Sequence, residues 1–254
     1  VSGAIGTITP KAVTLTAPAL SKVYDGSTAY TPTSADLAAL SAQLGVAGDA
    51  ISSATLGFAD RHAGTANKAA TLTAATIADG NGGANYSITL AGNSNSTITR
   101  RDVTLTYAGS GPVTKVYDGS TSGSIGVLSL TPDGFVSGEL MLPTQGLDLG
   151  TLGLPAVYDS QHAGSRTVTV ALGAWHAMDG TTENAANYNL PTTFTTAAVI
   201  TPRALTISGS AAAGKVYDGT VNATVTAGTL AGLVAGESLQ VSATGSFDSR
   251  HAGT

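Results

Sequence analysis

The sequence contains no cysteine and has few charged residues. Without cysteine among its 254 residues, disulfide frameworks and thiolate metal sites are excluded. Charged residues make up 11% of the chain and the net charge is −5, which argues against nucleic acid as a partner because nucleic-acid binding needs a basic face. The same balance gives no attraction to an anionic membrane surface. No run of 18 or more apolar residues is present, so the sequence predicts no membrane insertion.

Motifs of the common enzyme classes are missing as well. The sequence has no cysteine nucleophile, no Gly-x-Ser-x-Gly elbow and no phosphate-binding glycine loop. A calcium loop of the Asp-x-Asp-x-Asp-Gly type is also absent, although Asp25 with backbone oxygens stays open as a weaker calcium ligand set. We therefore expect no enzyme, no catalytic residue, no cofactor and no metal site.

Two short signatures recur three times. Lys-Val-Tyr-Asp-Gly and His-Ala-Gly together hold three of the five lysines and three of the four histidines. The signature positions are Lys22–Gly26, Lys115–Gly119 and Lys215–Gly219 for the first, and His62–Gly64, His162–Gly164 and His251–Gly253 for the second. A period of roughly 90–100 residues indicates a tandem array of small domains, and such arrays supply reach, spacing and adhesion more often than catalysis.

Further landmarks place the repeat boundaries. Asn-Tyr occurs at Asn85–Tyr86 and Asn187–Tyr188, and an Ile-Thr junction follows each pair at the same spacing. We expect the end of a preceding repeat at 1–9, repeat 1 at 10–99, repeat 2 at 100–201 and an incomplete repeat 3 at 202–254, so that the chain is a window from a longer array. Only two residues separate the last strand of one repeat from the first strand of the next, which favours a stiff connection.

Alternating apolar and threonine residues predict strands. Such stretches begin each repeat, as in Val13-Thr-Leu-Thr, and continue in segments such as Thr167-Val-Thr-Val. One segment, 34–45, places leucines at helical spacing, with Ser34 as the expected N-cap and Gly45 as the expected C-terminal residue. The fold class is therefore mainly β, a tandem array of small β-domains. Each domain is a β-sandwich or, alternatively, a β-grasp-like sheet with one short helix.

The recurrent residues support a structural and a ligand-binding interpretation. In the structural one, Val23 enters the core, the Lys22 stem lies along the Tyr24 ring and Asp25 caps a turn. In the other, Tyr, Lys and Asp form a sugar site in which the ring stacks and the carboxylate binds hydroxyl groups. The candidate residues are Lys22, Tyr24, Asp25, His62, Lys115, Tyr117, Asp118, His162, Lys215, Tyr217, Asp218 and His251.

Three further expectations concern a few individual side chains. Each signature histidine is expected to satisfy a buried carbonyl or carboxylate, because one His and one Asp per repeat make an incomplete metal-ligand set. A lysine beside an asparagine and a carboxylate, such as Lys22, Asn85 and Asp25, also admits an intramolecular isopeptide bond. Trp175 with His176 is either a core anchor or a private binding spot of repeat 2.

The signatures resemble the YDG-type repeat of very large bacterial surface proteins, and they are similar to the related MBG-type repeats. The resemblance covers the chain from Ile8 to Thr254 and is carried by the two signatures, Asn-Tyr and the Ile-Thr junction. It implies a haemagglutinin-like adhesin on the cell surface of a Gram-negative bacterium. The family context also implies export by two-partner secretion and a contribution to cell adhesion or biofilm.

Three functions follow as expectations. The first is an extracellular stalk that gives reach and stiffness, whose partners are neighbouring repeats of the same chain. The second is a module that binds extracellular polysaccharide or host-surface glycans by avidity, which requires exposed rings at Tyr24, Tyr117 and Tyr217. The third is a filament subunit that assembles by strand donation from Val1–Thr9.

Overall fold

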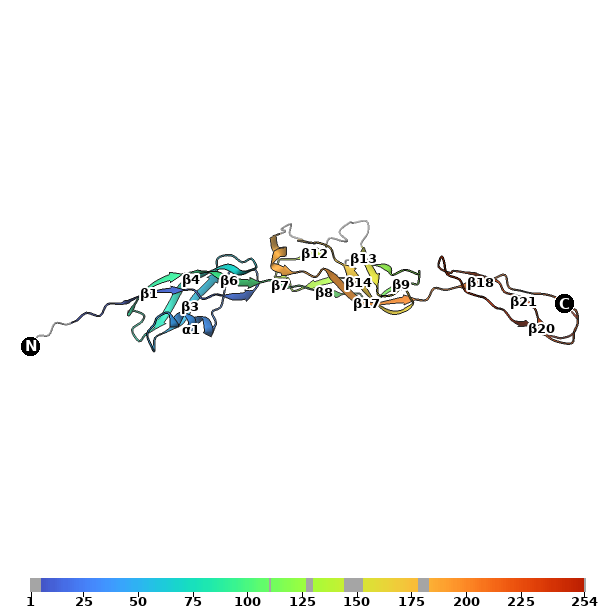
Figure 1. Ribbon diagram of the computed structural model, residues 1–254, viewed down its shortest axis with the longest axis horizontal. Helices are drawn as coiled ribbons and strands as arrows, with labels where there is room; N and C mark the ends of the chain where they lie inside the picture. The colour runs from blue at the N-terminus through green and yellow to red at the C-terminus, as the bar shows by residue number, and fades with distance from the viewer. Residues whose placement is uncertain (1–5, 110, 127–129, 144–152, 178–182, 254) are drawn as a thin grey trace, which may run out of the picture. The chain divides into compact units, whose positions relative to one another are not determined.

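The computed structural model describes residues 6–109, 111–126, 130–143, 153–177 and 183–253 (Figure 1). The chain divides into two compact units, each with its own internal contacts. Unit 1 comprises Val1–Thr106, Leu130–Asp148 and Leu172–Thr192, and unit 2 comprises Tyr107–Ser129, Leu149–Ala171 and Thr193–Thr254. Unit 1 thus contains repeat 1 with part of repeat 2, and unit 2 contains the rest of repeat 2 with repeat 3.

Unit 1 is built mainly from strands. Its elements are β1 (Lys11–Thr16), β2 (Ser21–Val23), α1 (Ser34–Ala42), β3 (Ala50–Phe58), β4 (Gly64–Ala78), β5 (Tyr86–Ala91), β6 (Asn93–Thr99), β7 (Arg101–Asp102), β8 (Thr104–Tyr107), β11 (Leu130–Asp133), β12 (Met141–Pro143), β15 (Trp175–Ala177), the 3₁₀ helix η2 (Glu183–Asn187) and β16 (Tyr188–Asn189). The mainly β fold class is confirmed, and no helix of the described residues is long and apolar enough to cross a bilayer.

Repeat 1 forms one four-stranded sheet and one parallel strand pair. The sheet order is β2-β6-β4-β3, in which β2 runs parallel to β6 and the other neighbours are antiparallel. The pair β1–β5 is parallel, with Lys11 opposite Tyr86. Helix α1 lies against β3 and contributes Leu40 to a core that also contains Leu15, Leu56 and Phe58. The last strand of the repeat, β6, therefore lies between two other strands and not at an edge of the sheet.

Unit 2 contains the matching sheet of repeat 2 and the strands of repeat 3. Its elements are β9 (Val113–Val116), β10 (Ser122–Gly126), β13 (Gly153–Tyr158), β14 (Gly164–Ala171), β17 (Thr193–Thr201), β18 (Thr206–Ser208), β19 (Ala211–Ala212), β20 (Asn222–Ala223), β21 (Val225–Thr226), β22 (Thr229–Ala231) and β23 (Gly245–Ser246). The five-stranded sheet has the order β10-β13-β14-β17-β9, and β17 runs parallel to β9 as β6 does to β2. The order β9-β17-β14-β13 therefore matches β2-β6-β4-β3 of repeat 1, and β10 adds a fifth strand at the edge.

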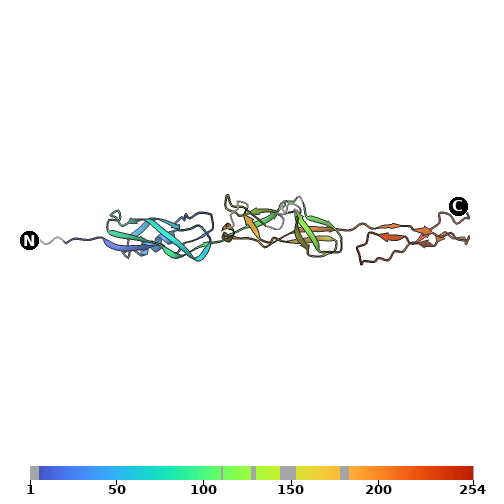
Figure 2. The same ribbon diagram turned by 90° about the horizontal axis from the view of Figure 1, so that it is seen from above.

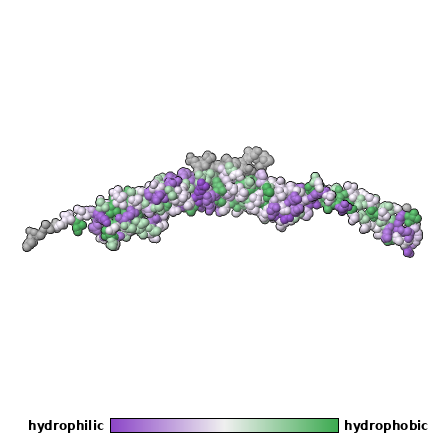
Figure 3. Space-filling view, in the orientation of Figure 1, coloured by the Kyte–Doolittle hydropathy of each residue, from purple (hydrophilic) through white to green (hydrophobic). Residues whose placement is uncertain are grey.

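Repeat 3 has smaller sheets than the other two repeats. Its strands form the pairs β18–β22, β19–β21 and β20–β23, which Figure 2 shows toward the C-terminus. Among residues 202–253 none is buried. On the face drawn in Figure 3, hydrophobic and hydrophilic residues are interspersed along the described chain.

The helix forms where the leucine spacing predicts it, but its caps differ from the expected ones. Thr33, one residue before Ser34, is the N-cap, and it exchanges hydrogen bonds with Asp36 in a capping box. The C-cap is Gln43, whereas Gly45 adopts a φ of +64° two residues later. Thr33 is the N-cap because its backbone is extended, which directs its side chain to the Asp36 amide, whereas Ser34 is already part of the helix.

The signature turns are seen, and the links between repeats differ in length. Gly26, Gly119 and Gly219 have φ values of 77°, 75° and 76°, the left-handed conformation that suits the glycine of an Asp-Gly turn. Strand β6 ends at Thr99 and β7 begins at Arg101, so only Arg100 separates these two elements. The two-residue link predicted at the second boundary is wrong, because four residues, 202–205, separate β17 from β18.

Candidate functional site

The signature lysine is the centre of a hydrogen-bonded turn in every repeat. Lys22 Nζ donates to Asp25 Oδ1 at 2.7 Å and to the backbone oxygens of Ser27 and Ala29 at 2.8 Å each. Its ammonium group also lies 5.5 Å from the centroid of the Phe58 ring. The donors of the ammonium group are thereby used inside its own repeat.

Repeats 2 and 3 reproduce this arrangement. Lys115 Nζ donates to Asp118 at 2.8 Å and lies 5.1 Å from the centroid of the Tyr158 ring. Lys215 Nζ lies 2.8 Å from Asp218 and 5.7 Å from the Phe247 centroid. The aromatic residue four positions before each signature histidine is therefore the platform for the signature lysine.

The aspartates of these turns are held in the charged form. The hydrogen bond from Lys115 and then the backbone amide of Ser120 lower the pKa of Asp118 to about 2, from an ordinary value of 3.8. The Lys215 hydrogen bond lowers the pKa of Asp218 to about 2 in the same way. Burial by itself raises the pKa of Asp25, but the bonds from Lys22 and Ser27 outweigh it and the net pKa is lowered. The prediction that Asp caps the turn is confirmed.

One detail of the structural interpretation is wrong. Val23 does not enter the core but is 54% exposed, and its counterparts Val116 and Val216 are exposed as well. The Lys22 ammonium group lies over the Phe58 ring. The alternation of faces holds, but Tyr24 is the inward residue, with an exposed fraction of 0%. A single exposed valine side chain is ordinary on a protein surface. The Tyr24 ring is buried instead, because its hydroxyl finds a hydrogen-bond acceptor inside.

That acceptor is Glu139 of the next repeat. Tyr24 Oη donates to Glu139 Oε1 at 2.8 Å, and Tyr188 Oη donates to Glu139 Oε2 at 2.6 Å. The two tyrosine rings meet edge to face with centroids 5.4 Å apart. Arg61 Nη1 lies 3.6 Å from Oε1 and balances part of the carboxylate charge. We call this set, together with Val136 and Gly26, the first junction.

Packing at the first junction explains the signature glycine. A Cβ at Gly26 would lie 2.8 Å from Val136 Cγ1, which is too close for any real side chain. Val136 N in turn donates to Tyr188 Oη at 3.0 Å. Glycine is therefore needed both for its positive φ and for the approach of the next repeat.

The histidine signature contacts the Asn-Tyr segment of the next repeat. Ala63 N donates to Asn187 Oδ1 at 2.9 Å, and Asn187 Nδ2 lies 3.3 Å from His62 Nδ1. Asn187 is 1% exposed, so its amide is committed to this contact. The expected carbonyl or carboxylate partner of the His62 ring is thus replaced by a carboxamide.

Burial and hydrogen bonding keep the junction phenols protonated. Burial first, and then the hydrogen bond to Glu139, raise the pKa of Tyr24 to about 12. The same causes raise the pKa of Tyr188 further. Neutral phenols are the species that donate to a carboxylate, so the junction geometry is stable at neutral pH.

Unit 2 contains a second junction built from the corresponding residues. Tyr117 Oη donates to Glu237 Oε1, and a Cβ at Gly119 would lie 2.9 Å from Val234 Cγ1. His162 is exposed and its amide donates to Ser160 Oγ at 3.2 Å. In repeat 3, Tyr217 is 62% exposed and His251 is exposed. Of the twelve predicted residues, the six lysines and aspartates thus form three turn networks, and Tyr24, His62 and Tyr117 contact the neighbouring repeat. The other three, His162, Tyr217 and His251, are exposed.

The remaining expectations have simple outcomes. Lys22 is bonded within its turn, while Asn85 faces Asn81 and Lys11, so the structure does not bring the two isopeptide partners together. Trp175 packs on Phe135 with centroids 6.2 Å apart and donates from Nε1 to Pro191 O, as a core anchor does. The His176 side chain lies outside the described set. In the described part of the chain no group of three metal-ligating side chains gathers.

Sequence reasoning missed the acidic partner of the signature tyrosine. Val-x-Gly followed by an acid occurs at Val46–Asp49, Val136–Glu139 and Val234–Glu237, and this recurrence was the available signal. The spatial link between Tyr24 and Glu139, 115 positions apart, is invisible in local patterns.

Comparison with known proteins gives one match. The model of the family described as YDG domain matches residues 9–97, 99–196 and 201–254. No curated protein matches, and no solved structure matches.

Proposed function

Because the chain belongs to the YDG domain family, we propose that it is part of the extracellular stalk of a large secreted bacterial adhesin, where it supplies reach and stiffness. Its role there is non-catalytic, and its main partners are neighbouring repeats. A Gram-negative cell surface, export by two-partner secretion and a place in the biofilm matrix belong to the same proposal.

The observation that carries the proposal is the burial of the signature tyrosine between repeats. Tyr24 is 0% exposed and its hydroxyl is bonded to Glu139, and the Tyr117–Glu237 contact repeats this bond. The residues that define the repeat thus hold its own turn and its neighbour. This is the distribution expected of a spacer, in which stability depends on nearest-neighbour contacts.

The stalk proposal is tested by the stiffness of the first junction. Because the chain lacks cysteine, cysteines introduced at Thr73 in β4 and at Leu140, both exposed, are the sole labelling sites for two spin labels. Pulsed electron resonance should give one narrow distance distribution, because Glu139, Val136 and Asn187 fix repeat 1 against the adjoining part of repeat 2.

A matched pair of variants supplies the control. Glu139→Ala should broaden the distribution, since it removes the acceptor of both phenols. Glu237→Ala removes the corresponding glutamate in unit 2 and should leave it unchanged. A broad distribution in the unaltered chain would remove stiffness from the proposal.

Glycan binding by the signature tyrosines receives less support from the geometry. It requires three exposed rings, whereas Tyr24 is buried, Tyr117 is half-buried and only Tyr217 is open. We expect residues 10–201 to bind neither matrix polysaccharides nor host-surface glycans. Binding that Tyr24→Ala with Tyr117→Ala abolishes, in a folded protein, would instead make each repeat a lectin-like unit.

Filament formation by strand donation is not favoured by a specific contact. Residues 1–5 of the expected donor lie outside the described set, and residues 6–9 form no strand.

A further inference from the structure

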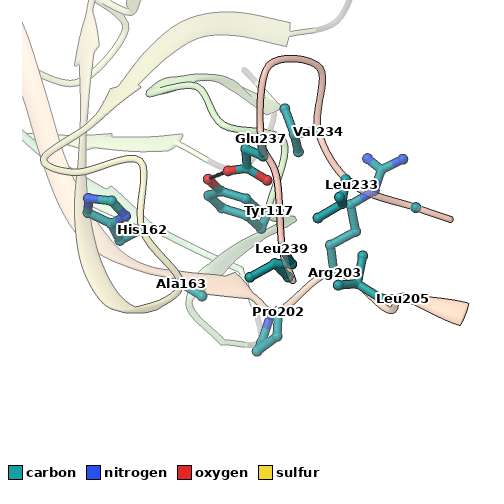
Figure 4. Close-up of a pocket in the computed structure, with 11 residues that line it drawn as sticks. Tyr117, His162, Ala163, Pro202, Arg203, Leu205, Leu233, Val234, Glu237 and Leu239 are labelled. Atoms are coloured by element: carbon teal, nitrogen blue, oxygen red, sulfur yellow. Dashed lines mark hydrogen bonds between the residues drawn. The ribbon is translucent and has the colours of Figure 1, made fainter. Parts of the chain in front are cut away.

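Unit 2 has a pocket beside Tyr117. Its volume is about 290 Å³, and its walls include Tyr117, His162, Ala163, Leu233, Val234 and Glu237 (Figure 4). In Figure 4 the Tyr117 hydroxyl meets the Glu237 carboxylate, Leu239 lies below the Tyr117 ring, and His162 lies on the side of the ring away from Leu233. The pocket therefore combines an apolar floor with a carboxylate and an imidazole.

The walls of this pocket correspond to residues that surround Asn187 and Tyr188 in unit 1. By position in the repeat, Tyr117 matches Tyr24, Glu237 matches Glu139 and Val234 matches Val136. Likewise His162-Ala163 matches His62-Ala63 in the second signature. Unit 1 thus shows which side chains bind to a set of residues of this kind.

Three contacts in unit 1 define this binding. The Tyr188 hydroxyl donates to Glu139 and accepts from the Val136 amide. The Tyr188 ring packs edge to face on Tyr24 and on Phe135, with centroids 5.4 and 5.0 Å away. The Asn187 carboxamide accepts from the Ala63 amide and faces His62. Each contact has a counterpart group in the pocket of unit 2, with Leu233 in the place of Phe135.

Strand register supplies an independent argument. Tyr86 lies opposite Lys11 in the parallel pair β1–β5, and Tyr188 lies opposite Arg101 in the parallel pair β7–β16. Arg203 is the counterpart of both basic residues and lines the pocket, and residues 202–205 form no strand. An extended segment that adds to this backbone in the same register brings its tyrosine opposite Arg203.

Exposed apolar surface at the pocket indicates that occupation is favourable. Leu239 is 60% exposed, whereas its counterpart Met141 is 1% exposed in the core that includes Tyr188. Leu205 is 38% exposed, against 5% for Val103. Covering such side chains contributes about 25 cal/mol for each Å² removed from water.

We propose that this pocket is a binding site for an extended peptide segment that carries Asn-Tyr, of the kind found in YDG-type repeats. The tyrosine hydroxyl bonds to Glu237 and the Val234 amide, the ring packs on Tyr117 and Leu233, and the asparagine spans Ala163 and His162. The segment adds as a strand parallel to residues 203–205. This site goes beyond the stalk proposal, because it can bind its peptide whether or not the array is stiff.

The test uses the full chain, labelled with ¹⁵N, and a peptide with the sequence of residues 183–192, Glu-Asn-Ala-Ala-Asn-Tyr-Asn-Leu-Pro-Thr. Addition of the peptide at up to millimolar concentration should shift the amide resonances of Ala163, Val234 and Leu239 in a saturable way. A Tyr188→Phe peptide, which keeps the ring and loses the hydroxyl, should bind about tenfold more weakly, as expected for a hydrogen bond to a charged group.

Variants of the chain distinguish this site from a general apolar contact. Glu237→Gln should weaken binding about tenfold, whereas Asp248→Asn, an exposed charge-matched change in the same repeat, should leave it unchanged. The amide spectrum of each variant shows whether repeat 3 keeps its fold. The absence of shifts at millimolar peptide, equal shifts with a Tyr188→Ala peptide, or shifts confined to other residues would overturn the proposal.

Discussion

At the scale of single residues, the signature lysine and aspartate form a closed unit. Lys115 bonds to Asp118 and to the backbone oxygens of Ser120 and Ser122, and Lys22 does the same in its own turn. The lysine neutralises the turn carboxylate and satisfies carbonyl groups that would otherwise need water.

The lowered pKa of Asp118 gives a pH prediction. With a folded value of about 2 and an ordinary value of 3.8, this carboxylate adds stability at pH values above about 3.8. The contribution is lost as the pH falls through the folded value. Carboxyl-carbon NMR should give an Asp118 midpoint of about 2, and Lys115→Met should move it back toward 3.8. A midpoint of 3.8 in the unaltered chain would contradict the lysine contact.

The sequence predicted these turns better than it predicted what lies inside. Asp-Gly indicates a turn because glycine adopts positive φ and aspartate bonds to the following amide, and both are local effects. The choice between Val23 and Tyr24 as the inward residue depends on Glu139, which lies in another repeat. Hydrophobicity alone therefore favoured the wrong residue of the alternating pair.

At the scale of elements, α1 shows how a cap fixes a helix start. The Thr33 side chain accepts from the Asp36 amide, and Asp36 accepts in return from Thr33 N at 2.8 Å and from the Tyr30 hydroxyl at 2.9 Å. Asp36 is buried, so this exchange also satisfies a carboxylate inside the domain. Leucine spacing revealed the helix, but cap identity depends on backbone angles that the sequence does not display.

Substitution of the cap should therefore have a measurable cost. Thr33→Ala should lower the free energy of unfolding by about 1 kcal/mol, because it removes the acceptor for the Asp36 amide. Ser34→Ala, at the first helical position, should change it by less than about 0.5 kcal/mol. Urea denaturation measures the free energy of unfolding of both variants. Equal effects of the two substitutions would contradict Thr33 as the N-cap.

The strands themselves were largely predictable, whereas their partners were not. Threonine alternation indicated β4, β5 and β14, since one-sided burial imposes a period of two. Nothing in that pattern indicates that β6 runs parallel to β2 and antiparallel to β4. Pairing is decided by register and packing across the whole domain.

At the scale of the whole molecule, the first junction makes repeat 1 and part of repeat 2 share one core. Val103, Met141 and Tyr188 belong to the same buried cluster as Leu15 and Leu56 of repeat 1. Landmarks in the sequence revealed the repetition but not this shared core, because the contacts join residues more than one hundred positions apart.

The contact between Gly26 and Val136 can be measured by a double-mutant cycle. Gly26→Ala should destabilise the chain through its positive φ and through collision with Val136, and Val136→Ala should relieve only the collision. The two changes should couple by about 0.5–3 kcal/mol, the range for residues in contact.

Gly219→Ala is the matched control, because its φ is nearly the same and no atom lies within 4 Å of its added Cβ. It should show the backbone cost of about 1–2 kcal/mol alone. Absence of coupling between Gly26→Ala and Val136→Ala in thermal or urea unfolding would refute the packing at this junction.

The inner position of β6 also sets the order of events during synthesis. Leu20 N donates to Ser96 Oγ across 76 positions, and Lys22 pairs with Ile98, so the first sheet strand gains its neighbour only when the last one exists. Non-local pairing of this kind makes folding slow, because the entropy of closing a long loop is lost before the strand contacts add any stability. A nascent repeat therefore stays open until nearly all of its residues have been made, and its sheet closes only when the last strand is present.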